Sequence, residues 1–245
     1  MSNKKIVLIT GANRGIGFET AKQLGQQNNT IIIGSRKFSD AEDAVAKLKE
    51  QGIDAHGIQL DITKESDRTA AAEIIGSTFG KLDILINNAG VAPKDMLIKS
   101  VNVETTAEEF EWVFQSNFFS VVHLTNTLLP LLKKSSAGRI VNLSSSVGSL
   151  TLQAMENSPL AAFRTLSYNA SKTSLNMFTI LLAEELKDFG IKVNSAHPGW
   201  VKTDMGSADA QLEITDGAKT SVELALIGQD GPSGKFYHLG ETVSW

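Results

Sequence analysis

Two residues with acid–base side chains, Tyr168 and Lys172, stand four positions apart in the second half of the chain. If this segment is helical, both side chains lie on one face of the helix. An ammonium group beside a phenol favours the phenolate and lowers the pKa of the tyrosine from its usual value of about 10. Such a tyrosine can give or take a proton near neutral pH, as the reduction of a carbonyl group requires. Pairs at this spacing also arise by chance, so the pair alone is a weak signal.

The pair gains weight from serines at the end of a predicted strand, 144–146, and from a glycine-rich turn at 10–17. Gly11, Gly15 and Gly17 stand between an apolar strand and an amphipathic helix. Glycines permit a tight turn, a close approach of a pyrophosphate to the backbone, and close helix–strand packing. The helix N-terminus then offers free N–H groups to the anion. The turn predicts a dinucleotide site; the alternative is an ordinary glycine-rich loop.

Cations follow the second predicted strand, where an NAD site would place an aspartate or glutamate. Arg36 and Lys37 can face the 2′-phosphate of NADP, and an arginine can bind it through two parallel hydrogen bonds. Arg14, inside the glycine turn, can reach the same phosphate. We assign Asp40, the nearest acid, to the start of the next helix. The pattern favours NADP(H); the alternative is a set of solvated loop cations.

Short β-branched segments alternate with longer amphipathic segments along the chain, and these elements must position the residues above. Strands are predicted over 5–10, 30–35, 55–60, 82–87, 139–144, 191–196 and 235–238. Helices are predicted over 16–27, 39–51, 64–79, 105–132, 166–189 and 218–229. Ser39 or Asp40 is the predicted N-cap of the second helix, with Gly52 at its end. The fourth helical stretch is expected to be two helices that meet near Asn117.

This alternation predicts an α/β fold with one doubly wound parallel sheet and helices on both faces. No linker or repeat interrupts it, so a single domain is expected over residues 1–245. Such sheets bind ligands beyond the C-terminal ends of their strands. Asp61 and Ile62 follow the third strand, where the adenine would lie. Asn88, Ala89 and Gly90 follow the fourth strand.

Composition excludes several classes of function. The 245 residues include no cysteine, which rules out a disulfide framework, a thiolate zinc site and a cysteine nucleophile. The histidines show no metal-ligand spacing, and no metal is expected. The net charge is −4 without a block of Lys or Arg, which argues against nucleic acid and an anionic membrane surface as partners. With no visible targeting or spanning segment, a cytoplasmic globular protein is expected.

Taken in order, these residues resemble the classical short-chain dehydrogenases/reductases. The matching motifs are Thr10-Gly11-x-x-x-Gly15-Ile16-Gly17, Asn87-Asn88-Ala89-Gly90, Asn117, Ser145, Tyr168-x-x-x-Lys172, and Pro198-Gly199 followed by Thr203. Within that family, the local sequences at 34–36, 117–119 and 128–131 and the ending at Trp245 look most like the NADPH-dependent carbonyl reductases. The resemblance implies a single Rossmann-type domain that binds NADP(H).

The resemblance also implies roles for individual residues. Tyr168 would protonate the carbonyl oxygen, Lys172 would hold the nicotinamide ribose and tune Tyr168, and Ser145 would hydrogen-bond the substrate oxygen. Asn117 would interrupt its helix and hold a water that relays protons to Lys172. Cofactor contacts are expected from Gly11, Asn13, Arg14, Gly15, Ile16, Gly17, Arg36, Lys37, Asp61, Ile62, Asn88, Ala89, Gly90, Tyr168, Lys172, Pro198, Gly199, Val201 and Thr203. Trp200 is expected either to line the substrate pocket or simply to pack in the core, and His197 is expected to shape its loop and not to act as a base.

We therefore expect an NADP-dependent oxidoreductase that moves a hydride between the nicotinamide and the carbonyl or alcohol carbon of a small organic substrate. One alternative is a catalytically silent NADP(H)-binding sensor, against which the intact set of catalytic-type residues argues. A sugar-nucleotide epimerase would need more chain than the 42 residues that follow Thr203. The 22 residues between Ser145 and Tyr168 exceed the usual family length and are rich in apolar side chains. We expect this segment to border the substrate pocket and to favour a monomer or dimer.

Overall fold

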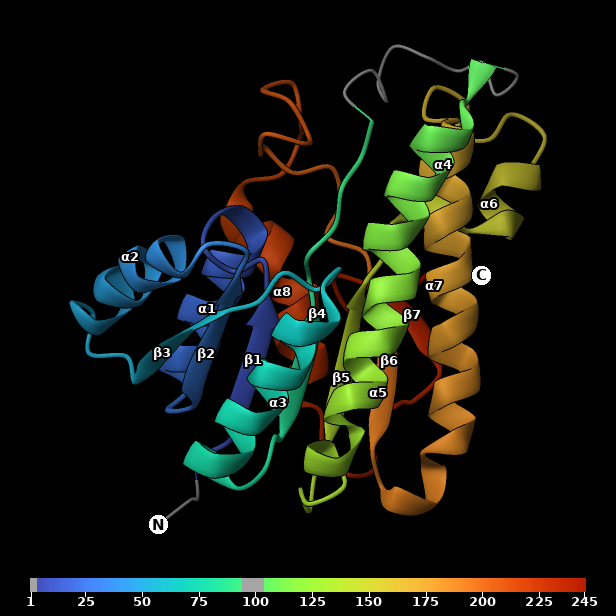
Figure 1. The fold of residues 1–245 in the computed structure, drawn as a ribbon. Helices are drawn as coiled ribbons and strands as arrows, with labels where there is room; N and C mark the ends of the chain where they lie inside the picture. Colours follow the sequence, from blue (N-terminus) through green and yellow to red (C-terminus); the bar gives the residue numbers. More distant parts are fainter. Residues whose placement is uncertain (1–3, 94–103) are drawn as a thin grey trace.

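The computed structural model describes residues 4–93 and 104–245, and its centre is an eight-stranded sheet (Figure 1). The spatial order of the strands is β3-β2-β1-β4-β5-β6-β7-β8. Their bounds are β1 Ile6–Thr10, β2 Thr30–Ser35, β3 Ala55–Gln59, β4 Ile84–Asn87, β5 Arg139–Leu143, β6 Lys192–Ala196, β7 Lys235–His238 and β8 Glu241–Thr242. Strands β1 to β7 pair in parallel, which confirms the predicted fold class over the body of the sheet.

One edge of the sheet carries an antiparallel strand in addition to the predicted parallel strands. Strand β8 was not predicted, and it pairs with β7 in the antiparallel sense, with His238 opposite Glu241. Leu239 and Gly240 connect the two strands, with φ angles of 46° and 82°. Positive φ at both central residues is what a two-residue hairpin of this twist requires. Two residues of strand are too few to give a periodic signal in the sequence.

Helices cover both faces of the sheet because alternate residues of each strand point to opposite sides (Figure 1). Leu8, Ile32 and Leu85 pack in one core with α3 Glu65–Phe79, α5 Ser120–Leu132 and α7 Leu166–Glu185. Ile9 and Ile33 pack in the other with α1 Gly15–Gln26, α2 Phe38–Lys49 and α8 Ile214–Leu226. Burial on both faces explains why the first strands are apolar throughout.

The helix boundaries agree with the sequence pattern within a few residues, but the predicted N-cap of α2 was wrong. Neither Ser39 nor Asp40 is its N-cap: the helix begins at Phe38 after Lys37, and Asp40 lies in its first turn. Ala41 and Ala44 are buried against the sheet, so packing rather than a side-chain cap fixes this helix. The short helix α6 Leu150–Ala154 was not predicted.

The long helical stretch 105–132 is interrupted where it was expected to be. Helix α4 runs over Ala107–Phe114, a π-helical turn follows over Gln115–Phe119, and α5 continues from Ser120. Asn117 lies in the middle of the π-helical turn and is buried. A π-helical turn inside an α-helix shifts the backbone by one hydrogen-bond step and often accompanies a functional site.

The chain reverses its direction of travel across the sheet between β1 and β4. Strands β2 and β3 extend from β1 to one side, and β4 to β7 extend to the other. Ligands of such sheets bind beyond the C-terminal strand ends at this switch point. Within the described part of the chain, every helix is too short or too polar to cross a bilayer.

Candidate active site

The glycine turn after β1 has the backbone that its sequence predicts. Gly11 and Gly15 have φ angles of 63° and 58°, which side-chain-bearing residues rarely adopt. A Cβ atom on Gly17 would lie 2.5 Å from Nδ2 of Asn88 and 2.8 Å from the carbonyl oxygen of Gly11. The Asn88 amide donates to the carbonyl oxygens of Thr10 (2.7 Å) and Gly11 (3.2 Å). The turn is therefore held in shape by the loop that follows β4.

The outer side of this turn is open and suits a pyrophosphate. A Cβ atom on Gly15 would meet nothing nearer than the Thr203 methyl group at 3.9 Å. Helix α1 begins there with Arg14 as N-cap and without a side-chain cap. Its first N–H groups can therefore bind an anion. The residues present fit a dinucleotide cofactor, with the segment around Thr203 facing the turn.

Arg14 has a partner that the sequence did not suggest. Its guanidinium donates to the Asp204 carboxylate at 2.6 Å, and both side chains are largely exposed. The Asp204 carboxylate would therefore compete with the 2′-phosphate for the Arg14 guanidinium. The pair joins the glycine turn to the loop that follows Thr203.

Arg36 and Lys37 follow β2, and both are exposed. Neither forms an ion pair or a side-chain hydrogen bond with any of the described residues, so both are free to receive an anion. Asp61 lies half-buried after β3, where its Oδ1 accepts hydrogen bonds from the backbone N–H and the hydroxyl of Thr63. Ile62 beside it is buried. The structure thus places the predicted adenine and 2′-phosphate residues at the ends of neighbouring strands.

The loop after β5 meets the first turns of α7. The Ser145 side chain lies close enough to that of Tyr168 to lower the pKa of the phenol, and Tyr168 is buried. The Lys172 ammonium donates to the carbonyl oxygen of Leu143 at 2.8 Å and lies 5.6 Å from the centre of the Tyr168 ring. A Cβ atom on Gly148 would come within 2.8 Å of the Lys172 Cβ, so the loop packs directly on the helix. Ser145, Tyr168 and Lys172 form one cluster.

The electrostatics of this cluster correct one expectation. Burial raises the pKa of Tyr168 to about 12, and the nearby Ser145 side chain offsets this rise only in part. Burial also lowers the pKa of Lys172 to about 8. The structure does not bear out the expected lowering of the Tyr168 pKa by Lys172, because desolvation of the phenolate is the largest effect on this group. Tyr168 is protonated near neutral pH, as a proton donor must be.

Asn117 connects the π-helical turn to this cluster. Its Oδ1 accepts from the Val91 N–H (2.8 Å), and its Nδ2 donates to the Val91 carbonyl oxygen (2.9 Å) and to the Ser171 hydroxyl (3.2 Å). A Cβ atom on Gly90 would lie 3.3 Å from the Asn117 Oδ1 and 3.7 Å from the Lys172 Nζ. The asparagine therefore lies beside Lys172 and fixes the loop after β4.

The segment after β6 carries the residues predicted to face a nicotinamide. Gly199 has a φ angle of 86°, and Val201 is buried and pairs with Leu212. The Thr203 hydroxyl accepts a hydrogen bond from the Gly206 N–H at 3.2 Å. Together with Pro198, these residues form a compact loop that ends opposite the glycine turn.

The long segment between Ser145 and Tyr168 packs on that loop. The Phe163 and Trp200 rings meet edge to face, with their centres 5.7 Å apart. Asn169 donates to the Phe163 carbonyl oxygen at 3.0 Å, and Gln153 donates to the carbonyl oxygen of Val147 at 3.2 Å. Sequence reasoning did not identify Asn169 or Gln153 as anchors, because a single amide side chain gives no signal of its partner. The segment thus lies beside the predicted nicotinamide loop.

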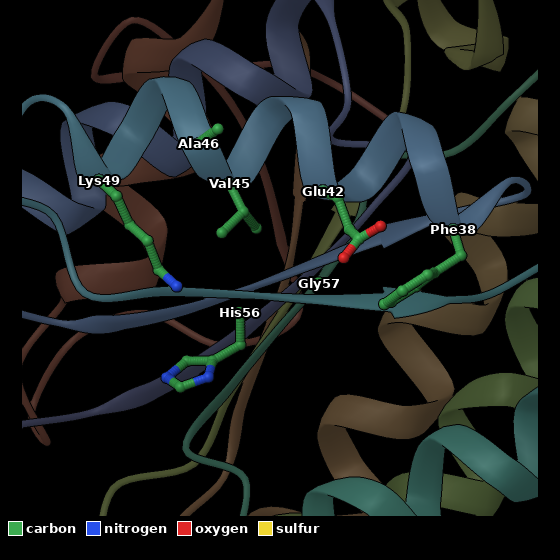
Figure 2. A pocket seen from close by; sticks show the side chains of 7 residues that line it. All are labelled: Phe38, Glu42, Val45, Ala46, Lys49, His56 and Gly57. Carbon is green, nitrogen blue, oxygen red and sulfur yellow. The ribbon is translucent and has the colours of Figure 1, made fainter.

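A groove of about 370 Å³ lies elsewhere, between α2 and the edge strand β3 (Figure 2). Its walls include Phe38, Glu42, Lys49 and His56. The strand order separates it from β5 and the serine loop by three strands. No three or more of the described histidine and acidic side chains are grouped so that they could hold a metal ion. The predicted catalytic side chains therefore lie at the strand ends and not in the groove.

Comparison with known proteins gives the same picture. A family model for short chain dehydrogenases matches residues 5–213. Short-chain dehydrogenase/reductase 1 of Saponaria officinalis is 31% identical over 99% of this chain and 97% of its own length. Salutaridine reductase from Papaver somniferum has a similar structure, with a TM-score of 0.82, 32% identity, and 96% and 99% of the two chains covered. An NADPH-bound carbonyl reductase from chicken fatty liver also has a similar structure, with a TM-score of 0.85 and 27% identity. The match covers 99% of this chain and 100% of the carbonyl reductase chain.

The family match covers most of the chain, and the relatives are covered almost from end to end. The chain belongs to the classical short-chain dehydrogenases/reductases, a family of oxidoreductases that use nicotinamide cofactors.

Proposed function

We propose that this protein is an NADP(H)-dependent oxidoreductase of the carbonyl reductase type, with one catalytic domain. It would move a hydride between the nicotinamide and the carbonyl or alcohol carbon of a small organic substrate. The observation that carries this proposal is the cluster of Ser145, Tyr168, Lys172 and Asn117 at the same strand ends as the open glycine turn. A catalytically silent sensor would have no need of this set.

The backbone of the glycine turn would hold the pyrophosphate, and the loop after β6 would hold the nicotinamide. When bound, the reduced nicotinamide supplies the hydride, and the protein supplies position and a proton. The open space outside Gly15 and the uncapped start of α1 support this placement. The proposed contacts are made by Gly11, Asn13, Gly15, Ile16, Gly17, Asn88, Ala89, Gly90, Pro198, Gly199, Val201 and Thr203.

Tyr168 would donate its proton to the carbonyl oxygen of the substrate. Its raised pKa keeps the phenol protonated near neutral pH, and the Ser145 side chain is its close neighbour. Ser145 would hydrogen-bond the substrate oxygen. Lys172 would hold the nicotinamide ribose, and Asn117 would keep the proton path to Lys172 in place. A positioned general acid of this kind contributes a factor of about 10² to 10⁴ in rate.

Arg36 and Lys37 would select NADP(H) over NAD(H). Both are exposed after β2, and a guanidinium can pair with the 2′-phosphate through two hydrogen bonds. Asp61 and Ile62 would border the adenine. The similar structure of a carbonyl reductase that binds NADPH supports the same choice of cofactor.

The apolar contact of Phe163 with Trp200 favours a substrate with an apolar body beside its carbonyl group. The names of the relatives, a carbonyl reductase and a salutaridine reductase, are consistent with organic carbonyl substrates.

The test is a screen for NADPH and NADH oxidation with aldehydes, ketones, quinones and 3-oxoacyl thioesters. We expect turnover of at least one carbonyl class and a higher kcat/KM with NADPH. Tight binding of NADPH without turnover of any class would contradict the proposal and favour the silent sensor. Equal or better use of NADH would contradict the choice of cofactor alone.

A further inference from the structure

Two loops of the site separate where the β5–β6 ladder ends. The last backbone hydrogen bond between them runs from the Ser144 N–H to the Ala196 carbonyl oxygen, at 2.8 Å. After Ser144 the backbone turns into the short 3₁₀-helix Ser146–Gly148, and after β6 it becomes the loop that begins at Pro198. Strand pairing alone therefore does not fix the spacing of these loops.

The His197 side chain spans this gap. Its Nδ1 atom accepts hydrogen bonds from the backbone N–H groups of Ser146 (3.3 Å) and Gly199 (3.4 Å). Ser146 is the neighbour of Ser145, and Gly199 belongs to the proposed nicotinamide loop. One imidazole nitrogen thus joins the two halves of the reaction site.

This arrangement requires one state of the imidazole ring. An Nδ1 atom that accepts from N–H groups carries no proton, so the proton is on Nε2. Burial, together with repulsion from His238, lowers the pKa of His197 to about 3, which keeps the ring neutral. The carbonyl oxygen of His197 lies 2.9 Å from Nδ1 of His238, and the two rings are 4.7 Å apart. His197 is therefore unsuited to act as a base, because the lone pair on its Nδ1 atom already accepts hydrogen bonds from two backbone N–H groups.

The surroundings hold the ring and its loop in place. A Cβ atom on Gly199 would lie 3.0 Å from Cε1 of His238 and would clash with Cδ1 of Leu212. The His197 N–H donates to the Tyr237 carbonyl oxygen at 2.8 Å, which continues the β6–β7 pairing past the end of β6. The imidazole is thus attached to a rigid part of the sheet.

We propose that His197 is a positioning residue: its imidazole sets the distance between Ser145, with its partner Tyr168, and the nicotinamide loop. This inference rests on the proposed function. Reacting groups displaced by about 1 Å can lose a factor of about 10² in rate. The chemical step should depend on His197, whereas cofactor affinity, to which the distant glycine turn contributes, should depend on it little.

The first experiment reads the hydrogen bonds without turnover. Nitrogen NMR of the ¹⁵N-histidine-labelled protein, without cofactor, gives the tautomer of each ring, and His197→Asn identifies the His197 signals. We expect a neutral ring with the proton on Nε2 that does not titrate between about pH 5 and pH 8. A proton on Nδ1, or titration near pH 6.5, would overturn the inference whether or not the protein proves to be a reductase.

The second experiment compares substitutions at position 197. Asparagine places an oxygen near the Nδ1 position, leucine places a methyl group there, and glutamine places its oxygen one methylene farther out. His56→Leu, on the edge strand far from the site, is the control for loss of an imidazole. We expect His197→Leu to lower kcat by about 10- to 100-fold and to raise the deuterium isotope effect measured with 4-deuterated NADPH. His197→Asn should stay within about threefold of the parent chain.

A merely structural role would reduce the folded fraction and so lower kcat without changing the isotope effect. An unchanged isotope effect in His197→Leu, or an equal loss in the Asn and Leu variants, would overturn the inference. If His197→Leu does not fold, the comparison of Asn with Gln decides, because equal losses there would again exclude a role for the Nδ1 acceptor. A parent chain that reduces no carbonyl would overturn the proposed function instead, and the NMR result would then decide the hydrogen-bonding claim.

Discussion

Replacement of Lys172 by methionine should remove a specific pH dependence of stability. The lysine is buried, and desolvation lowers its pKa from 10.5 to about 8 in the folded chain. The unfolded chain keeps the ordinary value. Between these two values the unfolded state binds more protons than the folded state, so stability rises with pH. Below pH 8 the folded chain bears the full cost of a buried charge.

The size of the effect follows from the pKa difference. One pKa unit corresponds to about 1.4 kcal/mol. From about pH 8 to pH 9.5 the folded state has lost the Lys172 proton and the unfolded state has not, which gives about 2 kcal/mol of added stability. Above about pH 10 the raised pKa of Tyr168 acts in the opposite direction, because the folded chain then holds a proton that the unfolded chain loses.

The assay is urea unfolding of the parent chain and of Lys172→Met at about pH 7 and pH 9.5. The comparison cancels the other titrating groups. The loss of the hydrogen bond to Leu143 lowers the stability of the variant at both pH values and leaves the difference intact. We expect the parent to gain about 2 kcal/mol relative to the variant. Parallel changes in both proteins would refute the statement that Lys172 is buried with a lowered pKa.

Three further predictions concern cofactor choice, substrate choice and assembly. Arg36→Asp should narrow or reverse the preference for NADPH, because a carboxylate repels the 2′-phosphate and can bind the ribose hydroxyl; an unchanged NADPH/NADH ratio of kcat/KM would exclude Arg36 as the discriminating residue. Phe163→Ala should change the KM ratio of two substrates of different size, and Met155→Ala, an exposed position on the same segment, is the control; equal ratios in both variants and the parent would exclude a role for the segment. Light scattering over a concentration series should give a monomer or a dimer. The segment 150–164 lies beside the start of α7 and covers part of that helix (Figure 1), whereas Met177 and Leu181 farther along it stay exposed and leave room for one partner. A stable tetramer at micromolar concentration would contradict this.

Periodicity and turn residues predicted most of the fold. Buried strands such as Thr30–Ser35 and long amphipathic helices have strong signals, and glycines such as Gly80 and Gly190 mark helix ends through left-handed backbone. Strand β8 has two residues and helix α6 has five, and such short elements do not repeat a pattern often enough to be recognised in the sequence. The N-cap of α2 was mispredicted because packing, and not a side-chain cap, fixes this helix.

The ordered motifs also predicted which side chains lie close together, since Ser145, Tyr168, Lys172 and Asn117 are neighbours at the strand ends. What the sequence could not give is the partner of each side chain. The Arg14–Asp204 ion pair joins residues 190 positions apart, and the His197 hydrogen bonds depend on how two loops separate. The pKa of Tyr168 was mispredicted for the same reason, because burial is a property of the packed structure.

The proposed mechanism requires that Tyr168 delivers the proton during carbonyl reduction. Tyr168→Phe removes the hydroxyl and keeps the ring, so the buried packing and the fold should survive. The decisive measurement is NADPH oxidation by the variant with the best carbonyl substrate of the parent chain, after circular dichroism has shown that both are folded. We expect the rate to fall by at least a factor of about 10² to 10⁴. A variant that keeps more than about half of the parent's activity would contradict the assignment of Tyr168 as the general acid.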